Sequence, residues 1–386
     1  MSKQLTTNLQ LKDLKSLDIP TPFLLIDLDE VKKQYKRLKK TLAHTNVYYA
    51  VKCNPDKRVL ETLKNEGSNF EIASIKEMKR LLDIGVDPKK IIFSNTVKMP
   101  AHIEEAAKLG IHSFAFDSYE EINKIAKYAP GSKVYVRMSV SNRGSLIELS
   151  SKFGADPDHI ITLLLEARER GLDPIGLSFH VGSQAENLSV WRAALERSAE
   201  LRKLLKKVGI EIEVLNIGGG FPIKYSGAIP SIDEIGSEIN RAIHDFKLTD
   251  LSIWCEPGRY IAGTSGVIGS EIILRTARDR HNWLFLDVGR FQAFVEMFES
   301  EEIQYPVHHL LESADEDFIA DRFVLTGPSC DSYDTIMKEV RLPAQMGEGD
   351  RLFFTNTGAY TVVYGSNFND FPMPKIHYYQ DLIEQQ

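Results

Sequence analysis

Several charged, polar and glycine residues stand at the ends of short apolar runs, where side chains from different runs could meet. They are Lys52, Glu71, Asn95, Asp117, Arg137, His180, Gly218, Gly219, Gly220, Glu256, Gly258 and Arg259. Lysine is rarely buried without a partner or a chemical role, so Lys52 in VYYAVKCNP is a candidate nucleophile. The glycine triplet would let backbone N–H groups approach a phosphate, and Arg259 could add a bidentate contact.

An amine, a phosphate site and a carboxylate partner for a ring nitrogen together indicate pyridoxal phosphate. The aldehyde of this cofactor would bond covalently to Lys52, so the amine need not be held as an unpaired buried cation. Each residue alone could instead have a structural role. Asn95 or Asp117 could cap a helix, and His180 could be an ordinary core histidine. The structural explanation weakens when all of them follow strands of one fold.

Short β-rich runs alternate with amphipathic helical stretches from about residue 46, the pattern of an α/β protein with a parallel sheet. The eight runs are Asn46–Cys53, Asn69–Ala73, Lys90–Asn95, His112–Asp117, Lys133–Ser139, Pro174–His180, Glu211–Ile217 and Leu251–Glu256. The stretches between them carry apolar residues three or four positions apart, and most end in glycine. Eight units predict a closed (β/α)8 barrel with its active site at the carboxyl ends of the strands.

After Arg259 the pattern changes. The runs VIGSEIILRTA, NWLFLDVG, RFVLTGPS, DRLFFTN and AYTVVYG follow one another without helices, which predicts a C-terminal antiparallel β domain. We therefore expect a barrel domain over residues 27–262 and a β domain over residues 263–386. The N-terminal run PFLLIDL predicts a strand over residues 20–26 that could join the β domain.

Composition argues against several classes of protein. The 386 residues are 43% hydrophobic, enough for two cores, and carry a net charge of -7 without an extended basic cluster, which argues against a nucleic-acid partner. The N-terminal stretch lacks a signal peptide or membrane span, so we expect a cytoplasmic protein with no membrane partner. The widely spaced Cys53, Cys255 and Cys330 favour free thiols. The neighbouring His308 and His309 have no carboxylate at ligand spacing, so no metal is expected.

Seven motifs occur in an order that indicates one family. They are YAVKCN, FEIAS, SFHVGSQ, NIGGGFP, CEPGR, GPSCDSYD and NTGAY. In these motifs the sequence resembles the fold type III pyridoxal-phosphate decarboxylases over about residues 20–379, and it is most similar to the short bacterial ornithine/lysine decarboxylases. The resemblance implies an alanine racemase-like barrel, a homodimer with shared active sites, and decarboxylation of a basic L-amino acid. That substrate would be ornithine, giving putrescine, or lysine, giving cadaverine, in polyamine biosynthesis.

The resemblance also implies a role for each matched residue. Lys52 holds the cofactor, His180 stacks on its ring and Glu256 pairs with its ring nitrogen. Cys330 is the catalytic thiol and Asp331 the carboxylate for the substrate amine, both supplied by the other subunit. The remaining cofactor-binding candidates are Glu71, Arg137, Ser183, Gly218, Gly219, Gly220, Gly258, Arg259 and Tyr360, and the remaining substrate-binding candidates are Tyr305 and Phe368.

Three departures from the family pattern leave the substrate open. Glu71 replaces an aspartate, Asp370 replaces a glycine, and residues 142–151 lack the tryptophan-proline pair of the bacterial branch. The substrate could therefore also be a larger or modified diamino acid, of the carboxynorspermidine, diaminopimelate or siderophore-precursor type. Diaminopimelate decarboxylases, however, resemble this sequence with glutamate in place of Asp331.

Two different functions on this fold match the sequence less well. An amino-acid racemase would have a basic residue at position 256. A non-catalytic regulator would be expected to have lost Lys52 or the thiol of Cys330, and the sequence retains both. Cys330 alone could be a small buried hydrophobic residue, the usual fate of cysteine, but its neighbour Asp331 favours a functional role.

Overall fold

The structure is a computed structural model that describes residues 4–147, 152–279, 281–311 and 319–383. The chain divides into two compact units. We refer to residues 34–222 and 229–260 as the barrel unit, and to residues 1–33, 223–228 and 261–386 as the sheet unit. Among the described residues, none of the helices has the length and apolarity needed to cross a lipid bilayer.

Eight parallel strands of the barrel unit form a closed ring in the order β10-β11-β2-β3-β4-β5-β6-β8. Their bounds are β2 Thr45–Ala50, β3 Asn69–Ile72, β4 Ile91–Phe93, β5 Ser113–Phe116, β6 Lys133–Arg137, β8 Asp173–Ser178, β10 Val214–Asn216 and β11 Ser252–Cys255. Each strand falls on one of the eight predicted runs, so the predicted barrel is confirmed. Two short strands, β7 (Ser145–Ile147) and β9 (Ser183–Ala185), pair separately as an antiparallel ribbon.

The strand that precedes Lys52 is shorter than predicted. The apolar run extends to Cys53, but β2 ends at Ala50, and Val51–Cys53 form a single 3-10 turn, η2. The backbone N–H of Ala50 donates to the carbonyl of Pro257 at 3.1 Å. Lys52 therefore lies on a turn beyond the strand rather than within it.

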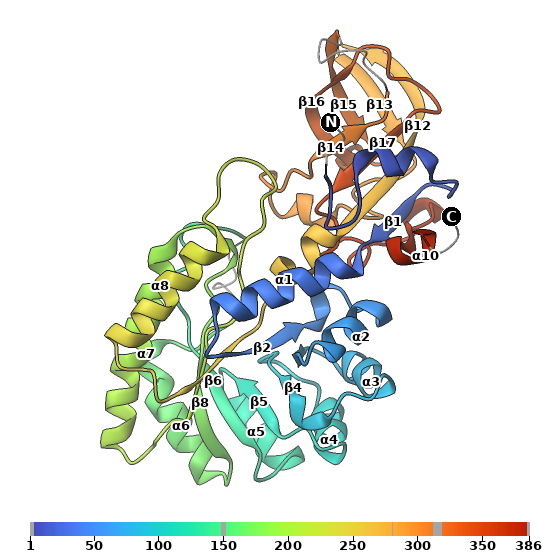
Figure 1. Ribbon diagram of the computed structural model, residues 1–386. Helices are drawn as coiled ribbons and strands as arrows, with labels where there is room; N and C mark the ends of the chain where they lie inside the picture. The colour runs from blue at the N-terminus through green and yellow to red at the C-terminus, as the bar shows by residue number, and fades with distance from the viewer. Residues whose placement is uncertain (1–3, 148–151, 280, 312–318, 384–386) are drawn as a thin grey trace. The chain divides into compact units, whose positions relative to one another are not determined.

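Helices cover the outside of the barrel (Figure 1). Their bounds are α2 Lys57–Asn65, α3 Ile75–Asp83, α4 Pro100–Lys108, α5 Tyr119–Tyr128, α6 Ile160–Glu169, α7 Leu188–Lys207 and α8 Ile232–Asp245. Two further helices, α1 Leu28–Thr41 and the short α9 Arg259–Ala262, contain residues of both units. Side chains just before several helices accept hydrogen bonds from the free N–H groups of the first turn. Asp56 does so for α2 and Ser74 for α3, while Ser231 and Glu234 form a capping box at α8.

Side chains fill the interior of the barrel. Seven buried residues from seven different strands pack together, namely Tyr48, Ile92, Ala115, Tyr135, Ile175, Val214 and Trp254. The rings of Tyr48 and Trp254 lie 4.9 Å apart between centroids. The barrel is therefore a packed core and not a pore, so chemistry must take place at the ends of its strands.

The sheet unit contains one eight-stranded sheet with the path β14-β17-β12-β13-β15-β16, to which β1 and β18 are attached through β12. The bounds are β1 Phe23–Ile26, β12 Gly266–Arg278, β13 His281–Leu286, β14 Val307–His309, β15 Ala320–Thr326, β16 Thr335–Pro343, β17 Arg351–Thr355 and β18 Lys375–Tyr378. Most pairs are antiparallel, whereas β13 with β15 and β1 with β18 are parallel. The predicted fold class, a barrel with a mostly antiparallel β domain, is confirmed.

One predicted strand of this unit is wrong. The β-branched and aromatic residues of AYTVVYG, residues 359–365, favour a strand, but this segment forms turns instead. Tyr360 has a φ of 54°, in the left-handed region, and the Thr361 hydroxyl donates to the Thr357 carbonyl at 2.7 Å. This local bonding supplies the backbone with a substitute for a sheet ladder.

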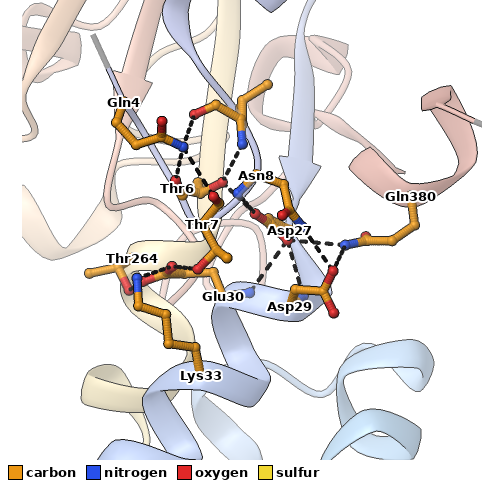
Figure 2. Close-up of polar contacts among 11 residues, drawn as sticks. Gln4, Thr6, Thr7, Asn8, Asp27, Asp29, Glu30, Lys33, Thr264 and Gln380 are labelled. Carbon is orange, nitrogen blue, oxygen red and sulfur yellow. Dashed lines mark hydrogen bonds and ion pairs between the residues drawn. The ribbon is translucent and has the colours of Figure 1, made fainter.

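A buried polar cluster joins both ends of the chain to the start of α1 (Figure 2). The carboxylate of Asp27 accepts hydrogen bonds from the Thr6 hydroxyl, from the backbone N–H of Asn8 at 2.9 Å and from Gln380 Nε2 at 3.0 Å. Gln380 belongs to the C-terminal helix α10 (Tyr379–Ile383). Asp27 is 1% exposed, and several donors satisfy its charge, as a buried carboxylate requires.

Candidate active site at the carboxyl ends of the barrel strands

The barrel brings most of the candidate residues to one end of its strands. Lys52 lies in η2 after β2, Glu71 in β3, Arg137 at the end of β6, His180 after β8, the glycine triplet after β10, and Glu256 directly after β11. All of these strands run parallel around the same closed ring. Side chains that are far apart in the sequence therefore surround one mouth, as the strand pattern predicts.

Lys52 and Glu71 form an ion pair at this mouth. Lys52 Nζ lies 3.6 Å from Glu71 Oε2, and the Lys52 side chain is 47% exposed whereas that of Glu71 is 1% exposed. The Glu71 carboxylate raises the pKa of Lys52, whose second carboxylate neighbour is Glu256. Burial raises the pKa of Glu71 to about 7 even though Lys52 acts against the shift. The pair therefore combines an accessible amine with a carboxyl group that titrates near neutrality.

His180 is held as a neutral ring. Burial lowers its pKa well below the ordinary value, and the cations Arg137 and Lys52 lower it further. Its Nδ1 lies 3.1 Å from the backbone nitrogen of Gly182, from which it accepts a hydrogen bond. Because an acceptor nitrogen carries no proton, the neutral imidazole must have its proton on Nε2.

Arg137 lies at the end of β6. Its guanidinium carbon is 5.2 Å from the ring centroid of Phe153, a cation–π distance. Burial lowers its pKa, while the carboxylates Glu256, Asp117 and Glu71 act in the opposite direction. An arginine remains charged despite such a shift, so Arg137 supplies a permanent cation among these carboxylates.

The glycine triplet leaves no room for side chains. Gly218 and Gly220 have φ values of 66° and 98°, which glycine adopts without strain. A Cβ on Gly219 would lie 2.6 Å from the Glu256 carbonyl oxygen, and one on Gly220 would lie 2.2 Å from that of Gly182. Backbone groups therefore approach each other closely here, as the sequence predicts for a phosphate cradle.

Arg259 and Ser183 add a cation and a hydroxyl within the same unit. Arg259 is 5% exposed, and its Nη2 donates to Ser183 Oγ at 3.1 Å. Ser183 lies on β9, and Arg259 begins α9 directly after the buried Gly258. A guanidinium, a hydroxyl and backbone N–H groups are the donors that bind phosphate; in the glycine turn the N–H of Gly218 is already used by Asn216 Oδ1, which leaves those of Gly219 and Gly220 as the candidates.

Sequence reasoning missed two residues that contact Glu256. Ser94 donates from its hydroxyl to Glu256 Oε1, and Asn216 Nδ2 donates to the same oxygen at 2.6 Å. Ser94 is 9% exposed and Asn216 is 1% exposed. Both stand at the ends of their strands, which was the signal available, but serine and asparagine at such positions usually indicate turns.

Two strand-end residues that sequence reasoning grouped with the site instead accept hydrogen bonds from backbone groups. Asn95 Oδ1 accepts from the backbone N–H of Val97 at 3.4 Å, and Asp117 Oδ2 accepts from that of Gly154 at 2.9 Å. Both side chains therefore satisfy backbone groups, as the structural explanation for them requires. In the case of Asn95, its neighbour Ser94 is the residue that reaches the site.

A second lysine near the strand ends also has a perturbed pKa. Burial lowers the pKa of Lys98 to about 8. Its side chain is fully buried, pairs with Glu121 at 2.9 Å, and donates to the carbonyls of Asn95 at 2.8 Å and Ala115 at 2.5 Å. These partners occupy all three of its protons, so Lys98 serves structure while Lys52 keeps an accessible amine.

The remaining candidates belong to the sheet unit. Cys330 is exposed, and its backbone N–H and its Sγ each lie 3.3 Å from Asn369 Oδ1. Asp331 follows it, and Asp331 Oδ1 accepts from the backbone N–H of Tyr333 at 2.8 Å, at the start of the turn η7 (Ser332–Asp334).

Aromatic candidates of the sheet unit lie in two environments. Phe368, in the turn η8 (Phe368–Asp370), is 38% exposed and packs against Phe291 with centroids 4.6 Å apart. Tyr305 is 1% exposed and lies 5.1 Å from the ring of Tyr225. Tyr360 stands in the turn after β17, 5.6 Å from the ring of Tyr364.

The structure gives a physical reason for the departure from the family pattern at Asp370, and it describes some of the residues of the departure at 142–151. Asp370 has a φ of 61°, a conformation that suits the family's glycine and that aspartate tolerates better than most residues. Of residues 142–151, Ser145–Ile147 form β7, and the Asn142 amide donates to the carbonyl of His180 at 3.1 Å. Residues 148–151 lie outside the described residues.

The residues present fit pyridoxal phosphate. The cofactor requires an amine for its aldehyde, donors for its phosphate and a carboxylate for its ring nitrogen. The barrel unit provides Lys52, the Gly218–Gly220 turn with Arg259 and Ser183, and Glu256. A side chain on the glycine turn would fill the cradle. Within the part of the chain that the structure describes, no group of three His, Cys, Asp or Glu residues is arranged to hold a metal ion.

Comparison with known families gives one assignment for the barrel. Residues 28–263 match the family model for the pyridoxal-dependent decarboxylase, pyridoxal binding domain. The lysine/ornithine decarboxylase of Selenomonas ruminantium is 34% identical over 376 residues, which cover 97% of this chain and 94% of that protein.

Solved structures give the same result for the whole chain. The crystal structure of SrLDC in complex with PLP and cadaverine superposes with a TM-score of 0.90 and 32% identity, covering 98% of this chain and 96% of the other. The lysine/ornithine decarboxylase of Vibrio vulnificus complexed with putrescine has a TM-score of 0.85 and 29% identity, covering 95% and 97%. The resemblance that the seven motifs suggested is therefore confirmed.

Proposed function

Because this chain belongs to the family of pyridoxal-dependent decarboxylases, we propose that it decarboxylates ornithine, lysine or both, giving putrescine and cadaverine. The observation that carries this proposal is the meeting of Lys52, Glu71, His180, Glu256 and the Arg259–Ser183 pair around one barrel mouth. The SrLDC structure is complexed with cadaverine and the Vibrio vulnificus structure with putrescine, which are the products of these two reactions.

When bound, pyridoxal phosphate supplies an electron-poor ring that accepts the electron pair left when a carboxyl group departs. Lys52 would hold the cofactor covalently, as its accessible Nζ at the barrel mouth allows. Glu256 would face the ring nitrogen and keep it protonated, since a carboxylate about 4 Å from a cation is worth about 4 kcal/mol at an intermediate dielectric. The neutral His180 would lie against the ring without adding a charge that opposes this protonation.

The phosphate would be held by the glycine turn and its neighbours. Gly218, Gly219 and Gly220 provide the close backbone approach, while Arg259 and Ser183 provide charge and a hydroxyl. We also propose phosphate contacts for Gly258 and, from the sheet unit, for Tyr360. Arg137 would act near the ring as a fixed cation that balances Glu71 and Glu256.

Proton return to the substrate would come from Cys330. Loss of the carboxyl group leaves a carbanion that needs a proton, and a positioned general acid contributes about 10² to 10⁴ in rate. Cys330 is the one exposed cysteine among the three, which are all free thiols. Asp331 would bind the distal ammonium of the substrate, and Phe368 would contribute apolar surface to the pocket. Tyr305 is 1% exposed, so the role expected for it as a pocket residue is not supported.

We propose that two copies of the chain share their active sites. Exposed aromatic side chains of the sheet unit support such an interface, since monomeric proteins rarely expose large apolar patches. They are Phe298, Tyr333, Tyr364 and Phe368. Two of them, Phe298 and Phe368, pack on the same ring, that of Phe291. The expected setting is the cytoplasm and polyamine biosynthesis, and the free thiols support a reducing compartment.

A substrate panel tests the proposed activity. Purified protein loaded with pyridoxal phosphate is supplied with [1-¹⁴C]-labelled ornithine, lysine or diaminopimelate, and release of labelled CO₂ is measured. Ornithine or lysine should react at least tenfold faster by kcat/KM than diaminopimelate. Preference for diaminopimelate, or no release from any of the three, would contradict the proposal and favour the larger or modified diamino acids.

A further inference from the structure

Glu256 is held through one of its two oxygens. Oε1 accepts from Ser94 Oγ and from Asn216 Nδ2, the latter at 2.6 Å. Oε2 makes no hydrogen bond with any residue in the described ranges. The two donors therefore orient the carboxylate and leave one oxygen for another partner.

Tyr135 extends the contact at Ser94. The Tyr135 hydroxyl and Ser94 Oγ lie 2.5 Å apart, and Tyr135 is fully buried in the barrel interior. A serine hydroxyl has one proton, and Ser94 directs it at Glu256. The phenol must therefore donate to Ser94, so the chain of hydrogen bonds runs from Tyr135 through Ser94 to Glu256.

Asn216 is fixed from its other side. Its Oδ1 accepts from the backbone N–H of Gly218 at 3.0 Å, and the Gly218 carbonyl accepts from the backbone N–H of Glu256 at 2.8 Å. These bonds close a ring that joins the end of β10 to the end of β11. The amide cannot turn away from Glu256 without breaking the bond to Gly218, and Gly218 also belongs to the expected phosphate turn.

The loop that carries Ser94 is anchored as well. Lys98, four residues further on, is fully buried and donates from Nζ to the Asn95 carbonyl at 2.8 Å and to the Ala115 carbonyl at 2.5 Å. Its ion pair with Glu121 offsets its charge. The backbone next to Ser94 therefore has little freedom to move.

We propose that Ser94, Tyr135 and Asn216 are positioning residues that fix the orientation of the Glu256 carboxylate, with Oε2 directed to the ring nitrogen of the cofactor. This inference rests on the proposed function. Hydrogen bonds to a charged group favour its charged form. Ser94 and Asn216 donate directly to Glu256 Oε1, and Tyr135 supports the Ser94 hydroxyl from the far side. These residues keep the ring nitrogen protonated without touching the cofactor.

The inference is tested with Ser94→Ala and Tyr135→Phe, each of which removes a single hydroxyl. Holoenzyme is prepared with ¹⁵N-labelled pyridoxal phosphate, and the ¹⁵N chemical shift of the ring nitrogen is followed against pH. In Ser94→Ala the ring nitrogen should lose its proton at a pH at least one unit lower than in wild type. Tyr135→Phe, which acts through Ser94, should cause a smaller shift in the same direction.

Turnover gives a second readout. Loss of one hydrogen bond to a charged group corresponds to about a tenfold to hundredfold effect. We expect kcat to fall by this factor in Ser94→Ala and by about threefold to tenfold in Tyr135→Phe, with KM changed less than threefold. The matched control is Ser198→Ala, since Ser198 is 1% exposed and donates to the Ala194 carbonyl at 2.7 Å within its own helix. It should match wild type in both readouts.

The outcomes separate this inference from the proposed function. If wild type binds the cofactor but releases no CO₂ from any substrate, the proposed activity fails, whereas the ¹⁵N titration still decides the role of these residues. An unchanged titration with kcat within twofold of wild type in Ser94→Ala would overturn the inference. Should Ser94→Ala fail to fold, the titration of Tyr135→Phe decides by the same criterion.

Discussion

Replacing Glu71 with glutamine tests the electrostatics of the site in the cofactor-free protein. Glu71 is 1% exposed and lies 3.6 Å from Lys52 Nζ. Burial raises its pKa from the ordinary 4.5 to about 7. Glutamine keeps the shape of the side chain but does not titrate. The substitution therefore removes one specific contribution to the pH dependence of stability.

The sign and size of the effect follow from the direction of this shift. A carboxyl group with a raised folded-state pKa stabilises the fold most below pH 4.5, and this stabilisation is lost as the pH rises to about 7. At about 1.4 kcal/mol per pKa unit, the loss is about 3 kcal/mol. Glu71 also raises the pKa of Lys52. Lys52 keeps its proton throughout this range, so it adds no pH dependence of its own, and its attraction to the Glu71 carboxylate is already included in the pKa of Glu71.

The assay isolates unfolding of the barrel unit. In a Trp283→Phe background, the remaining Trp191 and Trp254 both lie in the barrel unit, so their fluorescence reports on it. Urea unfolding is measured from pH 4.5 to pH 8. The unfolding free energy of Glu71→Gln minus that of the parent should increase by about 3 kcal/mol between pH 4.5 and pH 8, with an unchanged m-value.

A surface carboxylate provides the control. Glu105 is half-exposed and pairs with Lys79 at 2.9 Å, and such surface pairs contribute about 0 to 1 kcal/mol. The curve for Glu105→Gln should run parallel to that of the parent. Parallel curves for Glu71→Gln would refute the reasoning, because they would show that Glu71 does not titrate near neutrality in the folded protein.

Two further predictions concern the thiol. Asn369→Ala removes the oxygen that lies 3.3 Å from Cys330 Sγ and accepts from its S–H. Alkylation of Cys330 by iodoacetamide at pH 7.5, followed by mass spectrometry, should then be two to five times faster than in wild type or in the Asn367→Ala control. An equal or slower rate would contradict this role. Inactive Lys52→Ala and Cys330→Ala chains, mixed and allowed to exchange, should recover about a quarter of wild-type activity. Exchange of subunits is verified with differently tagged chains. If exchange occurs and no activity returns, a shared site is excluded.

The strand ends were predictable because their signals are local. Lys52, His180 and Glu256 each follow an apolar run, and the eight runs fixed their common position once the barrel closed. The roles of Ser94 and Asn216 could not be predicted because they depend on contacts between residues far apart in the sequence. Ser94 lies 162 residues before Glu256, and its role rests on a hydrogen bond that forms only at about 3 Å. A serine after a short strand gives no hint of that partner.

Two errors have a common physical cause. The predicted strand before Lys52 is too long, and residues 359–365 are not a strand, although β-branched and aromatic residues favour strands in both places. In both cases specific hydrogen bonds outweigh this preference, from Ala50 to the distant Pro257 in the first segment and from the Thr361 hydroxyl to the nearby Thr357 carbonyl in the second. Propensity cannot report these bonds.

The most direct measurement locates the covalent bond to the cofactor. Freshly prepared holoenzyme is reduced with borohydride, digested and analysed by mass spectrometry. We expect the pyridoxyl group on Lys52 alone, since Lys98, whose pKa is lowered by burial, has all its protons engaged. A pyridoxyl group on Lys98 or another lysine, or none on any lysine, would contradict the central claim.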